Sequence, residues 1–162
     1  MIKRPTNYCE EVILDSIPNI VILLKEYLES VGNGKEELLG LEKEAKVLAR
    51  ESAWRDGYKL AKILEDEFNW DSDSELVESL TEVEHIVYDS HRKLEKEWVK
   101  NNNITPKLKI GDKVMYKDYS ESKETEFEIT KIYYDEAKYG IQNESYKIKK
   151  RTYMIPYENF DK

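Results

Sequence analysis

The segment Asn101-Asn102-Asn103-Ile104-Thr105-Pro106 separates two parts of the chain that differ in hydrophobic period. Asparagine and proline both interrupt regular structure, and Pro106 disfavours the helical conformation of the residue before it. Before this segment apolar residues recur at intervals of three and four, and after it they alternate with polar ones. The sequence therefore predicts an α+β protein, with a helical domain at residues 1–103 and a small β domain at residues 106–162.

Three long helical segments are predicted before the boundary. The first begins near Pro18, which suits a first helical turn, with Ser16 as its cap, and residues 7–15 form a shorter helix before it. The second runs unbroken over residues 35–68 and the third over residues 72–100. Because the connection between these two is short, they are expected to pack antiparallel as an elongated helical hairpin. With the first helix alongside, they form a three-helix bundle.

The third helical segment carries an apolar seam with steps of four and three residues. Its members are Leu76, Leu80, Val83, Val87, Ser90 and Leu94. Such a heptad-like spacing is typical of helices that pair along their length. Charged residues make up 37% of the chain, which indicates a thin core. The seam and the thin core together predict self-association as a homodimer.

The part after the boundary is predicted to form a small SH3-like antiparallel β-barrel. Strands are expected at residues 111–119, 127–134, 139–142, 145–149 and 152–155. The alternation is interrupted between Ile129 and Ile132, which indicates a bulge there. Five short strands in so few residues suit a barrel of this kind.

The two ends of this β part carry a resemblance. Its opening segment is Lys109-Ile110-Gly111-Asp112-Lys113-Val114-Met115-Tyr116, and its closing segment is Ile155-Pro156-Tyr157-Glu158-Asn159-Phe160. In these segments the chain resembles the SH3-like C-terminal tails of small proteins carried by bacteriophages and mobile elements. The resemblance implies a protein of phage or mobile-element origin, and it brings no catalytic residue with it.

The charge is distributed unevenly along the chain. The sequence has 34 acidic and 26 basic residues, which argues against duplex nucleic acid as a partner, because phosphates require clustered bases. The segment 63–91 holds ten acids and no lysine or arginine. One interpretation is a solvated surface whose acids favour helix N-termini. The other is a recognition surface for a host protein with a basic surface. The predicted contacts are Asp71, Asp73, Glu75, Glu78 and Glu82.

A second possible site would bind a nucleotide-like small ligand. Basic residues interleaved with aromatic ones can pair with phosphate and stack on bases. The candidate contacts are Arg50, Trp54, Tyr58, Lys147, Lys149 and Arg151. The first three are expected on one helix face, next to Gly57, which permits close approach of another backbone or a ligand. The alternatives are ordinary helix packing and the preference of tyrosine for strands.

Motifs for catalysis, metals and cofactors are absent, so no catalytic residue, metal site or cofactor is predicted. Glu82 and His85 have the spacing of a di-iron ligand pair, but a second such pair is missing. His85 and His91 are six residues apart and are not expected to share a helix face. Cys9 stands beside two acids, which disfavour its thiolate.

No membrane-spanning segment or signal peptide is visible, and the expected location is the cytoplasm of a host cell. The longest aliphatic run is Ile20–Leu24, far shorter than the roughly 20 residues that a bilayer requires. The predicted function is a non-enzymatic, phage-type inhibitor or anti-defence binding protein that blocks a host protein through its acidic helical surface. The alternative is a sponge that sequesters a nucleotide signal molecule of a host defence system.

Overall fold

The computed structural model describes residues 3–32, 40–117, 123–144 and 151–160. The chain is an α+β protein, and it divides into two compact units, Met1–Leu94 and Glu95–Lys162. Among the described residues, no helix has both the length and the apolar stretch that crossing a membrane requires. The helices are α1 (Glu10–Ser30), α2 (Glu42–Glu51), α3 (Gly57–Phe68), α4 (Ser74–Leu80) and α5 (Val83–Asn101).

Helix α1 is continuous through Pro18, so the predicted helix start near this residue is wrong. Leu14 and Pro18 lie on the exposed side of the helix. Water can therefore hydrate the Leu14 carbonyl, which loses its intrahelical partner because proline has no N–H. Ser16 is not a cap; its buried hydroxyl donates to the Ile13 carbonyl at 2.7 Å.

The predicted helix over residues 35–68 is interrupted between α2 and α3. The Ser52 hydroxyl donates to the Ala49 carbonyl at 3.0 Å, and this carbonyl would accept the next backbone N–H of a continuing helix. Asp56 then starts α3, because its carboxylate accepts the backbone N–H of Lys59 at 3.0 Å. Residues 35–39 lie outside the described residues.

The predicted helix over residues 72–100 is also two helices, α4 and α5. The Thr81 hydroxyl donates to the Glu78 carbonyl at 2.6 Å, and the backbone N–H of Glu82 turns to the Ser79 carbonyl at 3.2 Å. A side-chain hydroxyl again competes with the backbone at the end of a helix. The elongated helical hairpin and its three-helix bundle are therefore wrong.

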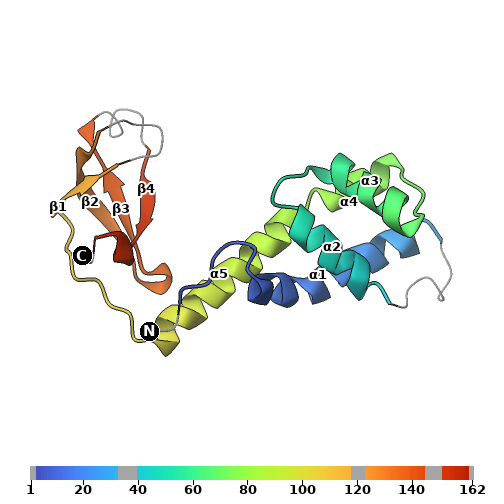
Figure 1. Cartoon of the computed structure of the whole chain (residues 1–162), viewed down its shortest axis with the longest axis horizontal. Coiled ribbons are helices and arrows are strands. Elements are labelled where there is room, and N and C mark those ends of the chain that lie inside the picture. Colours follow the sequence, from blue (N-terminus) through green and yellow to red (C-terminus); the bar gives the residue numbers. More distant parts are fainter. Residues whose placement is uncertain (1–2, 33–39, 118–122, 145–150, 161–162) are drawn as a thin grey trace. The chain divides into compact units, whose positions relative to one another are not determined.

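The core of the first unit is nevertheless built from the predicted apolar positions. Leu76, Leu80, Val83, Val87 and Ser90 of the predicted seam are buried, and Leu94 packs partly buried against the same core. In Figure 1, α2 lies across α1 and α3 lies beside α4, and both pairs are in contact. Gly57 allows the second pairing, because a Cβ there would lie 2.3 Å from the Val77 carbonyl oxygen.

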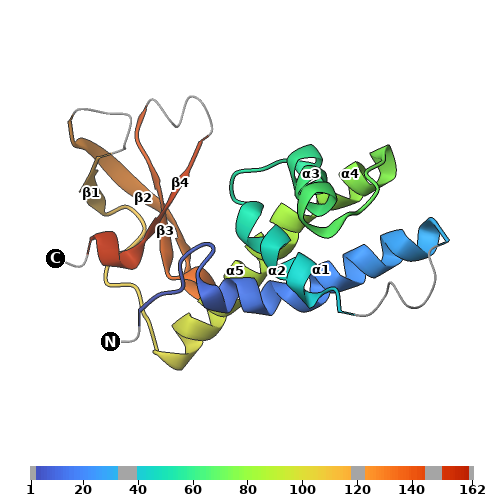
Figure 2. The same cartoon turned by 45° about the vertical axis from the view of Figure 1, so that its right-hand side comes forward.

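The second unit contains a four-stranded antiparallel sheet in the order β1-β2-β3-β4 (Figure 2). The strands are β1 (Lys113–Tyr116), β2 (Thr125–Tyr133), β3 (Lys138–Gln142) and β4 (Tyr153–Pro156). The register of β2 against β3 shifts between Ile129 and Lys131, which confirms the predicted bulge. Over the described residues the sheet is open, so barrel closure is not confirmed. The strand predicted at residues 145–149 lies outside those residues.

The last turns of α5 belong to this β unit. Trp98 and Val99 are buried in the same apolar cluster as the inward residues of the sheet. The Lys138 ammonium of β3 lies 2.6 Å from a Glu95 carboxylate oxygen and 3.5 Å from one of Glu136. The boundary between the units therefore falls inside α5, whereas the asparagine-rich segment follows it.

Candidate functional site

The five predicted acidic residues lie on α4 and on the turns before and after it. We call Asp71, Asp73, Glu75, Glu78 and Glu82 the acidic surface; all five are exposed. Asp73 caps α4 by accepting the backbone N–H of Leu76 at 2.8 Å. A Glu75 carboxylate oxygen accepts the Ser30 hydroxyl at 2.8 Å, which ties α4 to the end of α1. Two of the five residues therefore also have a structural role.

Three of these carboxylates converge on one buried phenol. Burial and the charges of Asp73, Glu75 and Asp71 raise the pKa of Tyr27 to about 12, and the Tyr27 hydroxyl bonds to Asp73. A negative charge near a phenol disfavours its ionised form. The negative field of the acidic surface is therefore concentrated where α1 ends and α4 begins.

A hollow of about 430 Å³ opens beside Asp71 and Asp73, and we call it the acidic hollow. Its lining comes from α1, α2 and the end of α3 with the turn that follows. The residues are Tyr27, Leu28, Val31, Leu41, Glu44, Phe68, Asn69, Trp70, Asp71 and Asp73. The rings of Tyr27 and Trp70 are stacked, with centroids 6.3 Å apart and planes at 19°.

A wider, shallower groove runs between α3 and α4, and Asp73 lines it as well as the acidic hollow. Tyr58, Ala61 and Val77 supply its apolar surface, and its volume is about 550 Å³. On its polar edge, Lys62 lies 2.7 Å from Glu65, a hydrogen bond that raises the pKa of the lysine. The acidic surface thus borders an accessible apolar groove, an arrangement common in protein-binding sites.

The described residues among the predicted ligand contacts belong to different elements. Arg50 donates to Glu10 at 2.9 Å. Because α2 ends at Glu51, Trp54 lies in the turn before α3 with 87% of its surface exposed, while Tyr58 is in α3. The expectation that Arg50, Trp54 and Tyr58 share one helix face is therefore wrong. Arg151 is exposed next to β4, and Lys147 and Lys149 lie outside the described residues.

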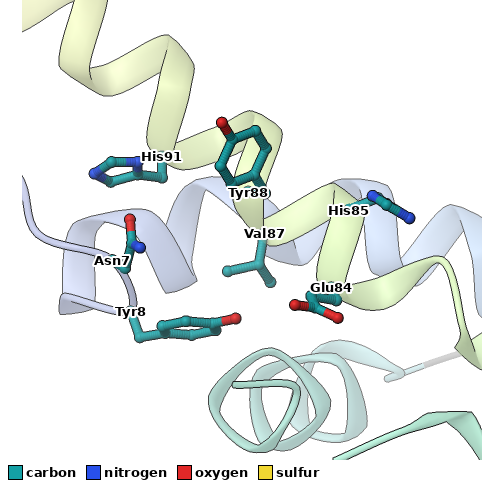
Figure 3. Close-up of a pocket in the computed structure, with 7 residues that line it drawn as sticks. All are labelled: Asn7, Tyr8, Glu84, His85, Val87, Tyr88 and His91. Carbon is teal, nitrogen blue, oxygen red and sulfur yellow. The ribbon is translucent and has the colours of Figure 1, made fainter. Parts of the chain in front are cut away.

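A second hollow, of about 360 Å³, lies between the N-terminal segment and α5 (Figure 3). It is lined by Asn7, Tyr8, Glu84, His85, Val87, Tyr88 and His91. Both histidines therefore border one hollow, although Figure 3 shows their rings on opposite sides of Tyr88. Among the described residues, no group of three or more histidine, cysteine or acidic side chains is placed to hold a metal ion.

Tyr8 in this second hollow has a strained backbone. It is the third residue of a turn closed by the Cys9 N–H and the Thr6 carbonyl at 3.1 Å, and its φ is 61°. Glycine or asparagine is usual at such a position, and another residue costs about 1–2 kcal/mol there. Burial raises the pKa of the Tyr8 hydroxyl, which Figure 3 shows directed toward Glu84, whose charge adds to the shift.

Reasoning from the sequence missed the residues that shape the hollows. Tyr27 lies in the first predicted helical segment and Glu44 in the second, and Trp70 lies in the short connection between the second and third. The one feature of the sequence that could have indicated the acidic hollow is the aromatic residue Trp70, which directly precedes the acids of the acidic surface.

Comparisons of the chain with models of known protein families, with curated proteins and with solved structures found no match. Function is therefore inferred from the acidic surface, the groove and the hollows.

Proposed function

We propose that the chain is a non-enzymatic binding protein, an inhibitor of the phage or anti-defence type, that blocks a basic surface of a host protein. The observation that supports this proposal is the convergence of Asp71, Asp73 and Glu75 on Tyr27. Carboxylates gathered around one side chain repel one another, and a basic partner relieves that repulsion and accelerates encounter. Glu78 and Glu82 extend the negative charge along α4.

The groove between α3 and α4 supplies the apolar contact that charge alone does not. Electrostatic complementarity contributes mainly to specificity and association rate, whereas buried aromatic and apolar side chains contribute most of the affinity. Tyr58 is 61% exposed beside this groove. A partner that carries an apolar side chain flanked by lysine or arginine would contact the groove and the acidic surface together.

The proposal includes three further expectations from the sequence. These are closure of the β unit as an SH3-like barrel, homodimerisation, and a location in the host cytoplasm. The four described strands, each paired antiparallel with the next along the chain, support the first, because such meanders build small barrels.

The test reverses the charge of the two carboxylates of the acidic surface that make no other described contact. The tagged wild-type chain is used to capture partners from a lysate of the cells that carry its gene, and each captured protein is then purified. Its affinity for the variant Glu78→Lys/Glu82→Lys is measured by calorimetry at low and high salt. The reversal is expected to weaken binding at least tenfold, and salt to weaken the wild-type complex.

The matched control is Glu42→Lys/Glu97→Lys, which changes the net charge equally at exposed positions on α2 and α5. Its affinity should stay close to that of the wild type. Equal affinity of both double variants would refute the proposal, because the effect would then depend on net charge and not on the acidic surface.

A further inference from the structure

The acidic hollow contains a carboxylate oxygen without a partner. Glu44 is half-buried in the first turn of α2, and its Oε2 atom is shielded from solvent. This oxygen accepts no hydrogen bond from any residue that the structure describes. An ionised oxygen in such a place is strongly disfavoured unless a donor reaches it. Because Glu44 lines an open hollow, a rotation of its side chain would present this oxygen to a donor carried by a ligand.

The other walls of the hollow suit a positively charged donor. Asp71 and Asp73 line the hollow together with Glu44, and the stacked rings of Tyr27 and Trp70 also line it. Aromatic ring faces attract cations within about 6 Å. The ammonium of Lys43 already lies 5.3 Å from the centroid of Phe68, another ring of this hollow.

The charge of the site excludes most other ligands. Three carboxylates line the hollow, and the first unit as a whole holds 21 acids against 12 bases, so phosphates and carboxylates are repelled. Metal ions find no group of three suitable side chains among the described residues. A neutral ligand could donate a hydrogen bond to Glu44 but would leave the negative charge of the three carboxylates uncompensated. An organic cation satisfies all three conditions.

Among organic cations, the geometry favours a guanidinium over an ammonium. A guanidinium is planar, presents paired N–H donors that match a carboxylate, and stacks on aromatic rings. A volume of about 430 Å³ also leaves room for an alkyl stem. We propose that the acidic hollow binds a guanidinium group, which donates to Glu44 and lies against Trp70. The group comes from an arginine side chain of a protein partner or from a free guanidino compound.

The test compares two small probes of nearly identical shape. L-arginine amide carries the guanidinium, and L-citrulline amide carries an uncharged urea in its place. Each is titrated into the full chain while the indole N–H resonance of Trp70 is followed by NMR. L-arginine amide is expected to shift this resonance saturably, with at least tenfold tighter binding than L-citrulline amide. Equal binding of the two probes, or no shift with either, would overturn the inference.

Glu44→Gln and Glu42→Gln form the matched pair of variants. Both residues are in the first turn of α2, but Glu42 is exposed and does not line the hollow. Glu44→Gln should weaken binding of L-arginine amide roughly tenfold or more, and Glu42→Gln should leave it unchanged. Glu44→Gln should also be at least as stable to urea as the wild type, because it removes an unpaired charge. A clear loss of stability would show an internal partner and overturn the inference.

Two further comparisons are needed. The first distinguishes the two sources of the guanidinium, and the second distinguishes failure of this inference from failure of the proposed function. Tighter binding of the peptide acetyl-Gly-Arg-Gly-amide than of L-arginine amide indicates an arginine side chain, and the reverse order indicates a free compound. The inference rests on the proposed function only for the first source. If L-arginine amide binds but the Glu78→Lys/Glu82→Lys reversal leaves partner affinity intact, the proposed function fails alone. If the reversal acts but L-arginine amide does not bind, the hollow inference fails alone.

Discussion

Replacing Lys138 with methionine should strongly destabilise the β unit. The Lys138 side chain is 17% exposed, and its ammonium lies between Glu95, which is 2% exposed, and Glu136, which is 6% exposed. Methionine keeps most of the alkyl stem but removes the charge, so two buried carboxylates remain beside each other without this lysine. Removing one partner of a buried ion pair typically lowers the free energy of unfolding by about 3–5 kcal/mol. Because Lys138 contacts two carboxylates, we expect Lys138→Met to cost about 4 kcal/mol.

The matched control is Lys113→Met on β1 of the same sheet. Lys113 lies 2.7 Å from Glu126, almost the same separation as in the buried pair, but the two side chains are 67% and 56% exposed. Exposed pairs typically contribute no more than about 0.5–1 kcal/mol, because water screens the charges. The two substitutions therefore share their chemistry and differ mainly in burial.

The assay is urea denaturation followed by the fluorescence of Trp98, which is buried in the core of the β unit. Trp54 and Trp70 are replaced by phenylalanine in all variants so that the signal reports this unit. Adding Glu95→Gln to Lys138→Met should restore part of the loss, because it removes the negative charge of one of the two buried carboxylates that Lys138 contacts. Equal losses for Lys138→Met and Lys113→Met would refute the reasoning, since burial would then make no difference.

Three other predictions concern packing, protonation and assembly. Gly57→Ala should destabilise the helical unit by about 1–3 kcal/mol in thermal denaturation, because the new Cβ would lie 2.3 Å from the Val77 carbonyl oxygen. Burial and nearby acids raise the pKa of Tyr27 from 10.0 to about 12, so the folded unit keeps a proton that the unfolded chain loses. The contribution of Tyr27 to the free energy of unfolding should therefore be complete below pH 10 and fall by about 1.4 kcal/mol per pH unit toward pH 12, and Tyr27→Phe should make the slope in urea titrations shallower by about this amount. Native mass spectrometry should give a bare dimer of twice 19.2 kDa, whereas a few hundred extra daltons per chain, lost on denaturation, would favour the nucleotide sponge.

The apolar period predicted which residues are buried better than where helices end. Leu80 and Val83 keep the spacing of the seam across the turn between α4 and α5, so the pattern alone shows no break there. The break depends on the Thr81 hydroxyl, which takes a backbone carbonyl that a longer helix would use. Ser52 does the same after α2. Serine and threonine also occur inside helices, so their presence does not reveal which of them end one.

The strands were more predictable, because a bulge leaves a visible fault in the alternation. Ile129 and Ile132 both face inward on β2 although they are three positions apart, and the register shift lies between them. A strand's neighbours also follow from short connections. Closure of the sheet into a barrel is harder to predict from the sequence, because it depends on pairing between segments that are distant in the chain and that no local pattern encodes.

The acidic surface could be predicted because its members are close together in the sequence. The acidic hollow could not, because Tyr27, Glu44 and Trp70 come from α1, α2 and the turn after α3, and only packing brings them together. That the Glu44 Oε2 atom accepts no hydrogen bond from the described residues likewise depends on which residues the fold places around it. The composition of the segment thus indicates a charge, and the fold decides which chemical group can reach it.

The division of α5 between the two units bears on how the gene could be rearranged by recombination. From the sequence alone, the asparagine-rich segment that follows α5 would be taken as the domain boundary. A crossover in its codons, however, would transmit a sheet without Trp98 and without the carboxylate of Glu95 that Lys138 contacts. A crossover near the codons of Leu94 and Glu95 would transmit both with the sheet. The segment that must be inherited together with the sheet therefore begins inside α5, before the asparagine-rich segment.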